Sequence, residues 1–210
     1  MPLPTHTAIL QVTNLCFSYL EREIFANTTV SFMAGITLIR GGDGRGKSTL
    51  LRLMAGALPA QLGQLHINGT NLQTDPASYG AQLFWADAAS EAFNTLSVPD
   101  YFDLQRRCHA GFDERVLADV VSGLGLQEHL HKQLFMLSTG SRRKVFLAAA
   151  FAAGAAVTLI DEPFTALDAA SIAFVLTWLK AADDASRAWV IADYVAPGDL
   201  HLAQIIELGD

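Results

Sequence analysis

The chain has little charge, few cysteines and no apolar run long enough to cross a bilayer. Charged residues make up 17% of its 210 residues and hydrophobic residues 51%, which is typical of a globular rather than a disordered protein. The longest apolar run, Val145 to Ile160, is shorter than the roughly 20 residues of a membrane helix, and Gly154 interrupts it. We interpret this run as a buried helix followed by a buried strand, so the protein would act at a membrane only by docking on another protein.

Further features that the sequence lacks disfavour several kinds of site and classes of protein. Cys16 and Cys108 are far apart and show no metal-type spacing, so both are expected to be reduced. Met1 to Thr7 lacks a basic region followed by an apolar stretch, so no signal peptide is expected and a cytoplasmic location is favoured. The net charge of −7 disfavours a protein whose main task is to neutralise nucleic-acid phosphates. The chain contains no internal repeats or long linkers, and no Gly-x-Ser-x-Gly motif of a serine hydrolase.

The most informative feature that is present is a glycine-rich loop with P-loop spacing. It reads Gly41, Gly42, Asp43, Gly44, Arg45, Gly46, Lys47, Ser48, Thr49. A short apolar segment, residues 36–39, precedes it and a helical pattern from Leu50 to Gly56 follows, which is the context this motif requires. Glycines allow several N–H groups to converge on one anion, and a helix N-terminus adds positive potential. Lys47 would reach the β- and γ-phosphates of a nucleotide, and the Ser48 hydroxyl would ligate Mg²⁺.

The rest of the chain predicts an α/β core interrupted by helices. Strands are expected at 9–19, 27–32, 35–39, 64–67, 82–86, 157–160, 188–192 and 204–208, and helices at 46–57 and 169–182. Between Ala88 and about Ala149 the apolar spacing is helical, with a break at the glycines 123 and 125 and a further helix starting near Gly140.

A second motif follows the apolar strand at 157–160. Asp161 and Glu162 come directly after it, where parallel α/β sheets bind their ligands. Asp161 is then placed to hold the hydration shell of Mg²⁺, and Glu162 to deprotonate a water that attacks the γ-phosphate. By itself this Asp-Glu-Pro segment could equally be a strand end that begins a loop.

A third segment, Leu137 to Ser141, precedes this strand. Ser138 and its small neighbours can cap a helix and offer donors to a phosphate, although an ordinary helix cap explains them as well.

Taken together, these segments resemble the ATP-binding cassette (ABC) ATPase family over nearly the whole chain. Leu137–Ser141 is similar to the family's signature loop, Ala166-Leu167-Asp168 to its D-loop, and Tyr19 to the aromatic residue that stacks on adenine, although Tyr19 could also be a core residue. The resemblance implies a RecA-like P-loop NTPase core (1–87 and 150–210), an inserted helical subdomain (88–149) and an N-terminal antiparallel β element, all in one ATPase domain.

The family mechanism implies that two cassettes pack head to tail, as a homodimer or a heterodimer. Each ATP lies between one P-loop and the partner's signature loop, so Ser138 and Gly140 would serve the partner's nucleotide and Asp168 would lie at the same interface. ATP closes the pair and hydrolysis reopens it. A transmembrane permease converts the motion into transport, which would place this subunit on the cytoplasmic face of the membrane. The length, with no further domain expected after Asp210, resembles minimal bacterial cassettes such as the haem-exporter ATPase subunit.

Several positions depart from the family pattern. Asp87 stands where a glutamine is usual, in an alignment that can slip by one residue, and a carboxylate there could touch Mg²⁺ but would weaken ATP binding. Tyr194 stands at the switch-histidine position; its hydroxyl can bond phosphate but carries no positive charge at neutral pH. Thr139 and Ser141 replace a usual glycine and glutamine. We therefore expect ATP to bind and to be hydrolysed slowly; the alternative is a degenerate cassette that holds ATP as a switch.

Other classes fit less well. A cassette without a membrane partner usually carries two cassettes or long insertions, and a P-loop GTPase needs an Asn-Lys-x-Asp motif, which the sequence lacks. His129 and His131 beside Glu128 are interpreted as a solvated segment rather than a metal site, and 142–144 as a solvated basic face or a phosphate contact. Three aromatic residues would line a permease groove or belong to the core; they are Trp85, Phe93 and Tyr101.

Overall fold

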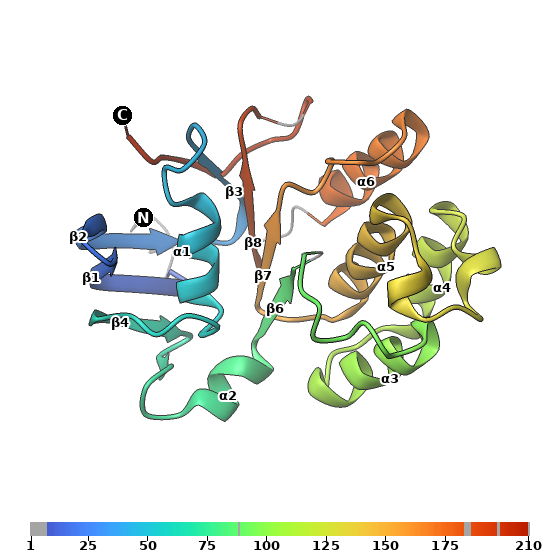
Figure 1. The fold of residues 1–210 in the computed structure, drawn as a ribbon, viewed down its shortest axis with the longest axis horizontal. Coiled ribbons are helices and arrows are strands. Elements are labelled where there is room, and N and C mark those ends of the chain that lie inside the picture. Colours follow the sequence, from blue (N-terminus) through green and yellow to red (C-terminus); the bar gives the residue numbers. More distant parts are fainter. Residues whose placement is uncertain (1–7, 88, 183–185, 197, 210) are drawn as a thin grey trace, which may run out of the picture.

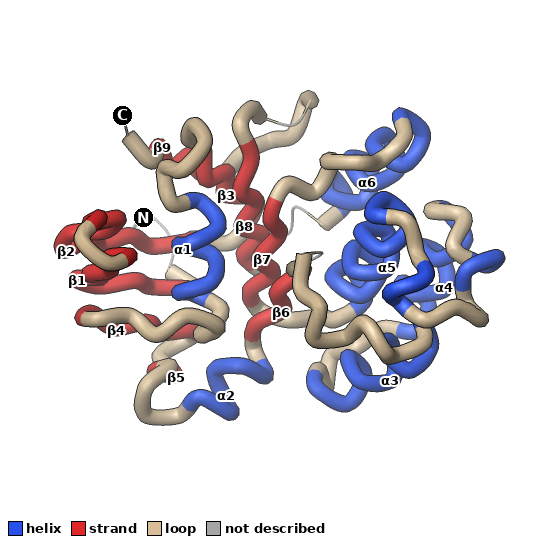
Figure 2. The backbone as a smooth tube through the Cα atoms, viewed as in Figure 1, coloured by secondary structure: helices blue, strands red, loops and turns tan. Residues whose placement is uncertain are grey.

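A computed structural model describes residues 8–87, 89–182, 186–196 and 198–209 of the chain. The described part holds two sheets with helices between and beside them (Figures 1 and 2). The strands are β1 Leu10–Tyr19, β2 Arg22–Phe32, β3 Gly35–Arg40, β4 Leu62–Ile67, β5 Thr70–Asn71, β6 Leu83–Ala86, β7 Val157–Asp161, β8 Ala188–Asp193 and β9 Gln204–Glu207. The α-helices are α1 Lys47–Met54, α2 Pro76–Ala81, α3 Val98–Cys108, α4 Glu114–Gly123, α5 Thr139–Ala152 and α6 Ala169–Ala181. Two 3₁₀ turns, Gln127–His129 and Leu134–Met136, join α4 to α5. The expectations for Met1–Thr7, for the boundary at Ala88 and for the chain after Asp210 lie outside the described residues.

A parallel sheet forms the centre of the molecule, in the strand order β6-β7-β8-β3-β9. Its inner strands β7, β8 and β3 are buried on both faces, which explains why they are nearly continuous apolar runs. In β8, Trp189 and Ile191 face one hydrophobic cluster, whereas Val190 and Ala192 face the other. All five strands point the same way, so the loops after β3, β7 and β8 emerge at one edge of the sheet.

An antiparallel sheet, in the order β2-β1-β4-β5, covers one side of this core with α1 packed between the two sheets (Figure 1). On the opposite side, α3, α4, α5 and α6 pack against the other face of the parallel sheet. The α/β architecture with an N-terminal antiparallel element, expected from the sequence, is therefore confirmed.

Some boundaries differ from those expected. The second strand begins at Arg22 rather than at residue 27, because antiparallel pairing continues up to the Tyr19–Arg22 pair beside the turn. The first helix ends at Met54 rather than at 57, because Gly56 adopts a φ of 69°, which terminates a helix. Helix α2 was not expected from the sequence; Asp75 caps it by accepting a hydrogen bond from the N–H of Ser78.

Candidate functional site

The glycine-rich loop connects the end of β3 to the start of α1. Gly46 adopts a φ of 92°, and a Cβ there would lie 2.7 Å from Ile24, so the loop requires glycine at this position. Of the six α-helices in the described residues, α1 alone begins without a side-chain cap; Asp75, Ser97, Asp113, Ser138 and Asp168 cap the others. The first N–H groups of α1 therefore lack the partner that every other helix has, which fits them to bind an anion such as a phosphate.

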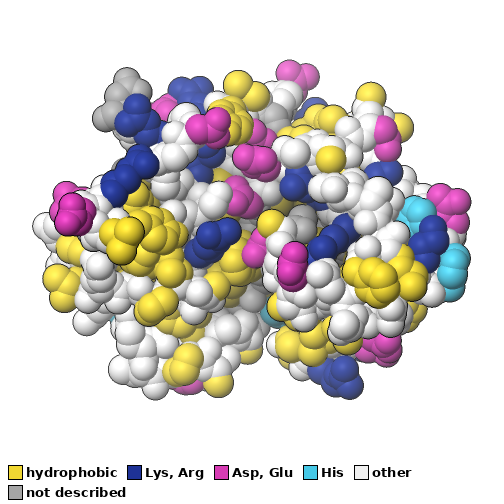
Figure 3. All heavy atoms as spheres, in the orientation of Figure 1, with side chains coloured by type: hydrophobic (Ala, Val, Ile, Leu, Met, Phe, Trp, Pro, Cys, Tyr) yellow, Lys and Arg dark blue, Asp and Glu magenta, His cyan; other side chains and the backbone are white. Residues whose placement is uncertain are grey.

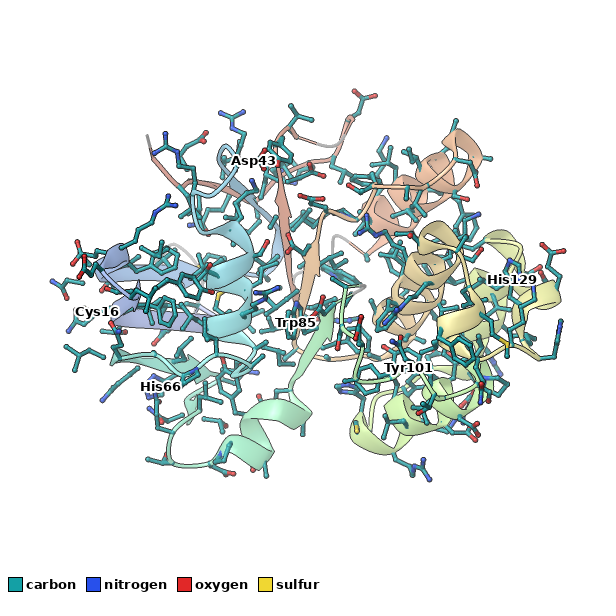
Figure 4. All side chains as sticks on the ribbon, viewed as in Figure 1. Cys16, Asp43, His66, Trp85, Tyr101 and His129 are labelled. Atoms are coloured by element: carbon teal, nitrogen blue, oxygen red, sulfur yellow. The ribbon has the colours of Figure 1, made fainter. Side chains whose placement is uncertain are left out.

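Lys47 lies folded back within this loop. Its Nζ donates hydrogen bonds to the carbonyl oxygens of Gly41, at 2.7 Å, and Gly42, at 3.1 Å. The same ammonium lies 4.0 Å from the ring centroid of Tyr194, whose hydroxyl donates to the carboxylate of Asp43. The structure thus brings three predicted site residues together over the loop, and Figure 4 shows Asp43 at the upper edge of the central sheet.

A depression of about 310 Å³ lies over the loop. Residues 42–49 line it, together with Tyr19, Glu162 and Tyr194. Tyr19 is 42% exposed, so it is not the core residue that the alternative interpretation described, and its hydroxyl lies 3.5 Å from Thr49 Oγ1. Sequence reasoning missed Arg22, which also lines the depression and donates to the carbonyl of Gly44 at 2.9 Å.

Asp161 ends β7 at the same edge of the sheet. Its pKa lies above the usual value because burial penalises the charged form; a hydrogen bond from Ser48 opposes the rise, and the charges of Glu162 and Asp87 add to it. Its buried Oδ1 has no hydrogen-bond partner among the described residues. A carboxylate oxygen without a hydrogen-bond partner, next to a serine hydroxyl, provides oxygen ligands that suit Mg²⁺ and its bound water.

Asp87 follows β6, next to β7 in the sheet. Its carboxylate accepts a hydrogen bond from the N–H of Ala89 at 3.1 Å, so part of its acceptor capacity is used within its own loop.

Glu162 begins the loop after β7 in a left-handed conformation, with a φ of 46°. Its N–H donates to the carbonyl of Ala192 at 2.9 Å, and its carboxylate accepts from the hydroxyl of Thr165 at 3.1 Å. The guanidinium of Arg143 donates to the carbonyls of Glu162, at 2.8 Å, and Thr165, at 2.6 Å. The pKa of Arg143 lies below its usual value, chiefly because of burial. The interpretation of residue 143 as part of a solvated face was therefore wrong.

Asp193 is a further charged residue at this edge that sequence reasoning did not select. It ends β8, which lies between β7 and β3 in the sheet. Burial and the charge of Glu162 raise its pKa, while Lys47 and Arg143 oppose the rise. Its position at a strand end was the available signal. Figure 3, which shows the molecule in the orientation of Figure 1, has acidic and basic side chains close together in the middle of the view.

The predicted signature loop occupies a different place. The described residues that line the depression include neither Ser138 nor Gly140. Ser138 caps α5, and a Cβ on Gly140 would lie 2.4 Å from the carbonyl oxygen of Ala166, so the signature loop packs directly against the D-loop. Lys144 pairs with Asp168 at 2.9 Å and holds the pKa of that carboxyl well below its usual range.

The interpretation of His129 needs correction, and the structure decides between the two alternatives given for Tyr101. His129 is not simply solvated: its side chain is 18% exposed and contacts Ser141 and Lys132. Tyr101 is 1% exposed and packs on Phe93 and Phe146, which confirms the core alternative for this residue. No cluster of three metal-binding side chains occurs among the described residues.

A P-loop at the carboxyl edge of a parallel sheet, with an acidic strand end beside it, defines a nucleoside-triphosphate-binding α/β protein. The family model described as "ABC transporter" matches residues 27–165, and the chain belongs to this family. The ATP-binding subunits of the family are ATPases, and this chain is one of them. The resemblance noted in the sequence is thereby confirmed.

The chain is similar in sequence to ATP-binding proteins of several bacterial transport systems. The chain is 36% identical over 193 residues to the cytochrome c biogenesis ATP-binding export protein CcmA of Paramagnetospirillum magneticum, which covers 87% of this chain and 88% of the relative. It is 31% identical to the CcmA of Pseudomonas savastanoi pv. phaseolicola over 78% of each chain. It is also 30% identical to the zinc transport system ATP-binding protein TroB of Treponema pallidum, over 81% of this chain and 66% of the relative.

Solved structures share the fold. An ATP-binding subunit of an ABC transporter superposes with a TM-score of 0.79 at 21% identity, covering 89% of this chain and 80% of that chain. A bacterial Atm1-family ABC exporter with ATP bound gives a TM-score of 0.72 at 20% identity, over 93% of this chain and 37% of that chain. Within the described residues, no helix combines the length and apolarity needed to cross a membrane.

Proposed function

We propose that this chain binds and hydrolyses Mg-ATP at an interface with a second ABC ATPase subunit and thereby drives transport through a separate permease. The observation that carries the proposal is the uncapped N-terminus of α1, with Lys47 and the Ser48–Asp161 pair beside it. N–H donors, a cation and a carboxylate with a free oxygen are the groups that a magnesium-bound triphosphate needs.

Each site residue then has a role. Backbone groups of 41–46 hold the phosphates, Lys47 neutralises the β- and γ-phosphates, and Tyr19 stacks on the base. Ser48 and Asp161, with Asp87 nearby, hold the magnesium ion, which supplies charge neutralisation on the phosphate oxygens. Glu162 accepts a proton from the attacking water, and Tyr194 bonds the phosphate oxygens from the end of β8.

The pair of subunits completes the site. Ser138 and Gly140 begin α5 outside the depression, as residues that serve the partner's nucleotide would. Residues 88–149 form the helical subdomain of the single ATPase domain, and 1–87 with 150–210 form its nucleotide-binding core. Similarity to the CcmA proteins supports a subunit of that export type, docked on a permease at the cytoplasmic face.

A second candidate is a cassette that binds ATP as a switch with little turnover. Tyr194 favours it, because its hydroxyl is bonded to Asp43 and its ring lies on Lys47, where a γ-phosphate would bind.

Phosphate release by the purified protein separates these candidates. The wild type should release phosphate from Mg-ATP, Glu162→Gln should lose this activity by a factor of about 10² or more, and the exposed Glu91→Gln should leave it unchanged. Equal release by the wild type and Glu162→Gln would contradict the catalytic assignment. Nucleotide binding without release in the wild type would favour the switch.

A further inference from the structure

His129 lies in a chain of polar contacts that leads to the signature loop. Its Nδ1 lies 3.0 Å from Nζ of Lys132, and its Nε2 lies 3.1 Å from Oγ of Ser141. The side chain is only 18% exposed, so solvent does not readily replace these partners. Figure 4 shows His129 on the helical side of the molecule, far from Asp43.

The lysine determines which nitrogen of His129 carries the proton. An ammonium group has three donors and no lone pair, so the hydrogen bond from Lys132 requires Nδ1 to be an acceptor. The neutral ring must then carry its proton on Nε2, which becomes a donor to Ser141. Glu128 Oε1 lies 3.6 Å from the same nitrogen, beyond hydrogen-bond distance, so the serine is the nearer acceptor.

Ser141 transmits this contact to Ser138. The Ser138 hydroxyl donates to Ser141 Oγ at 3.0 Å, and Ser138 Oγ accepts the N–H of Ser141 at 3.1 Å. Because Ser141 Oγ accepts from His129, the Ser141 O–H can rotate to donate to Ser138 Oγ, and the Ser138 proton then becomes available to a phosphate. The contacts with the hydroxyl and N–H of Ser141 also restrict the rotamer of Ser138. Ser141 stands where the family usually carries a glutamine. This protein therefore has a shorter side chain at that position, and His129 contacts it.

We propose that His129, through Ser141, is a positioning residue that holds the Ser138 hydroxyl for the nucleotide of the partner subunit. This inference rests on the proposed function, because it requires Ser138 to act in hydrolysis. Two charged groups lie close to the ring of His129. Lys132 fixes the tautomer, and Glu128 lies beside the donating nitrogen.

The test combines a spectroscopic and a kinetic measurement. Long-range ¹H–¹⁵N spectra of the histidine rings, recorded on the full chain, should show the Nε2–H tautomer for His129. His129→Leu should lower kcat for phosphate release about 3- to 10-fold, the loss expected for one hydrogen bond, with an unchanged KM for ATP. His129→Gln should restore kcat, because an amide offers one donor and one acceptor. The exposed neighbour variant His131→Leu serves as the matched control and should behave as wild type.

Two further variants separate the possible failures. Ser141→Ala removes the contact between His129 and Ser138 without altering His129, and it should lower kcat as much as His129→Leu does. If Ser138→Ala lowers kcat while His129→Leu and Ser141→Ala do not, the inference is overturned and the proposed function stands. If Ser138→Ala has no effect, the role of Ser138 at the interface is wrong, and the inference fails with it. An Nδ1–H tautomer would also overturn the inference, even if His129→Leu failed to fold.

Discussion

The ammonium group of Lys47 lies 4.0 Å from the ring centroid of Tyr194, so the aromatic ring covers the cation that would meet a γ-phosphate. The hydroxyl of Tyr194 also donates to Asp43 within the phosphate-binding loop. A residue from the end of β8 therefore contacts the loop after β3, the adjacent strand in the sheet. A triphosphate bound at this loop would compete with both contacts.

This arrangement predicts opposite effects for two substitutions of Tyr194. Tyr194→Phe retains the ring but loses the hydroxyl that would bond phosphate, so kcat for phosphate release should fall about 3- to 10-fold while ATP still binds. Tyr194→His supplies a group that can carry positive charge and should raise kcat. Steady-state phosphate release measures both; an unchanged kcat in the phenylalanine variant would count against a role of the hydroxyl in turnover.

Arg143 is expected to stabilise the loop that carries Glu162. Arg143→Met removes two hydrogen bonds from the charged guanidinium to the carbonyls of Glu162 and Thr165, the first of which is partly buried. The free energy of unfolding should drop by about 1–3 kcal/mol, and phosphate release should fall because Glu162 is no longer held. Urea denaturation gives the first quantity. Arg107→Met, at an exposed position, is the control, and an equal loss in both variants would refute the contact.

The contact between the signature loop and the D-loop predicts that Gly140 cannot accept a side chain. A Cβ there would approach the carbonyl oxygen of Ala166 to 2.4 Å, and a backbone atom cannot move aside as a flexible side chain can. Gly140→Ala should lower the free energy of unfolding by about 1–3 kcal/mol. Gly80→Ala, in α2 with open space around it, should be neutral or stabilising by up to about 1 kcal/mol. Indistinguishable urea midpoints would show that the two loops are not packed as described.

The Lys144–Asp168 pair predicts a pH-dependent contribution to stability. The pKa of Asp168 is lowered, first by the hydrogen bond from Lys144 and then by the N–H of Ser171. A lowered pKa means that the stabilisation is complete above the carboxyl's ordinary pKa and is lost as the pH falls through the lowered value. Asp168→Asn keeps the helix cap but removes the charge. It should therefore destabilise the protein at pH 7, and the difference should shrink in acid; a difference that grew in acid would contradict the sign.

The parts of the site that the sequence predicted are those encoded locally. The P-loop and the Asp161–Glu162 pair are recognisable because each is a few consecutive residues whose neighbours predict a strand and a turn. Parallel strand order then explains why both motifs meet at one edge. Helix α2 was missed because it is short, although Asp75 followed by a proline was a visible start signal.

Contacts between distant segments were not predictable in the same way. Arg22 reaches Gly44 and Arg143 reaches Glu162 through long side chains whose partners have no fixed spacing in the sequence. His129 was interpreted as part of a solvated segment because its contact with Ser141 becomes evident only when the 3₁₀ turn packs against α5. For Tyr101 the sequence left a groove and the core open, and the packing of its ring against Phe146 of α5 decides for the core.

Binding of nucleotide at the uncapped start of α1 is the claim on which the rest depends. Titration calorimetry of the folded protein with ATP and magnesium measures it most directly. We expect saturable binding by the wild type and a loss of at least about tenfold in affinity for Lys47→Ala, because the principal cation at the phosphates is removed. Absence of any binding heat from the wild type, together with identical behaviour of Lys47→Ala, would contradict the account.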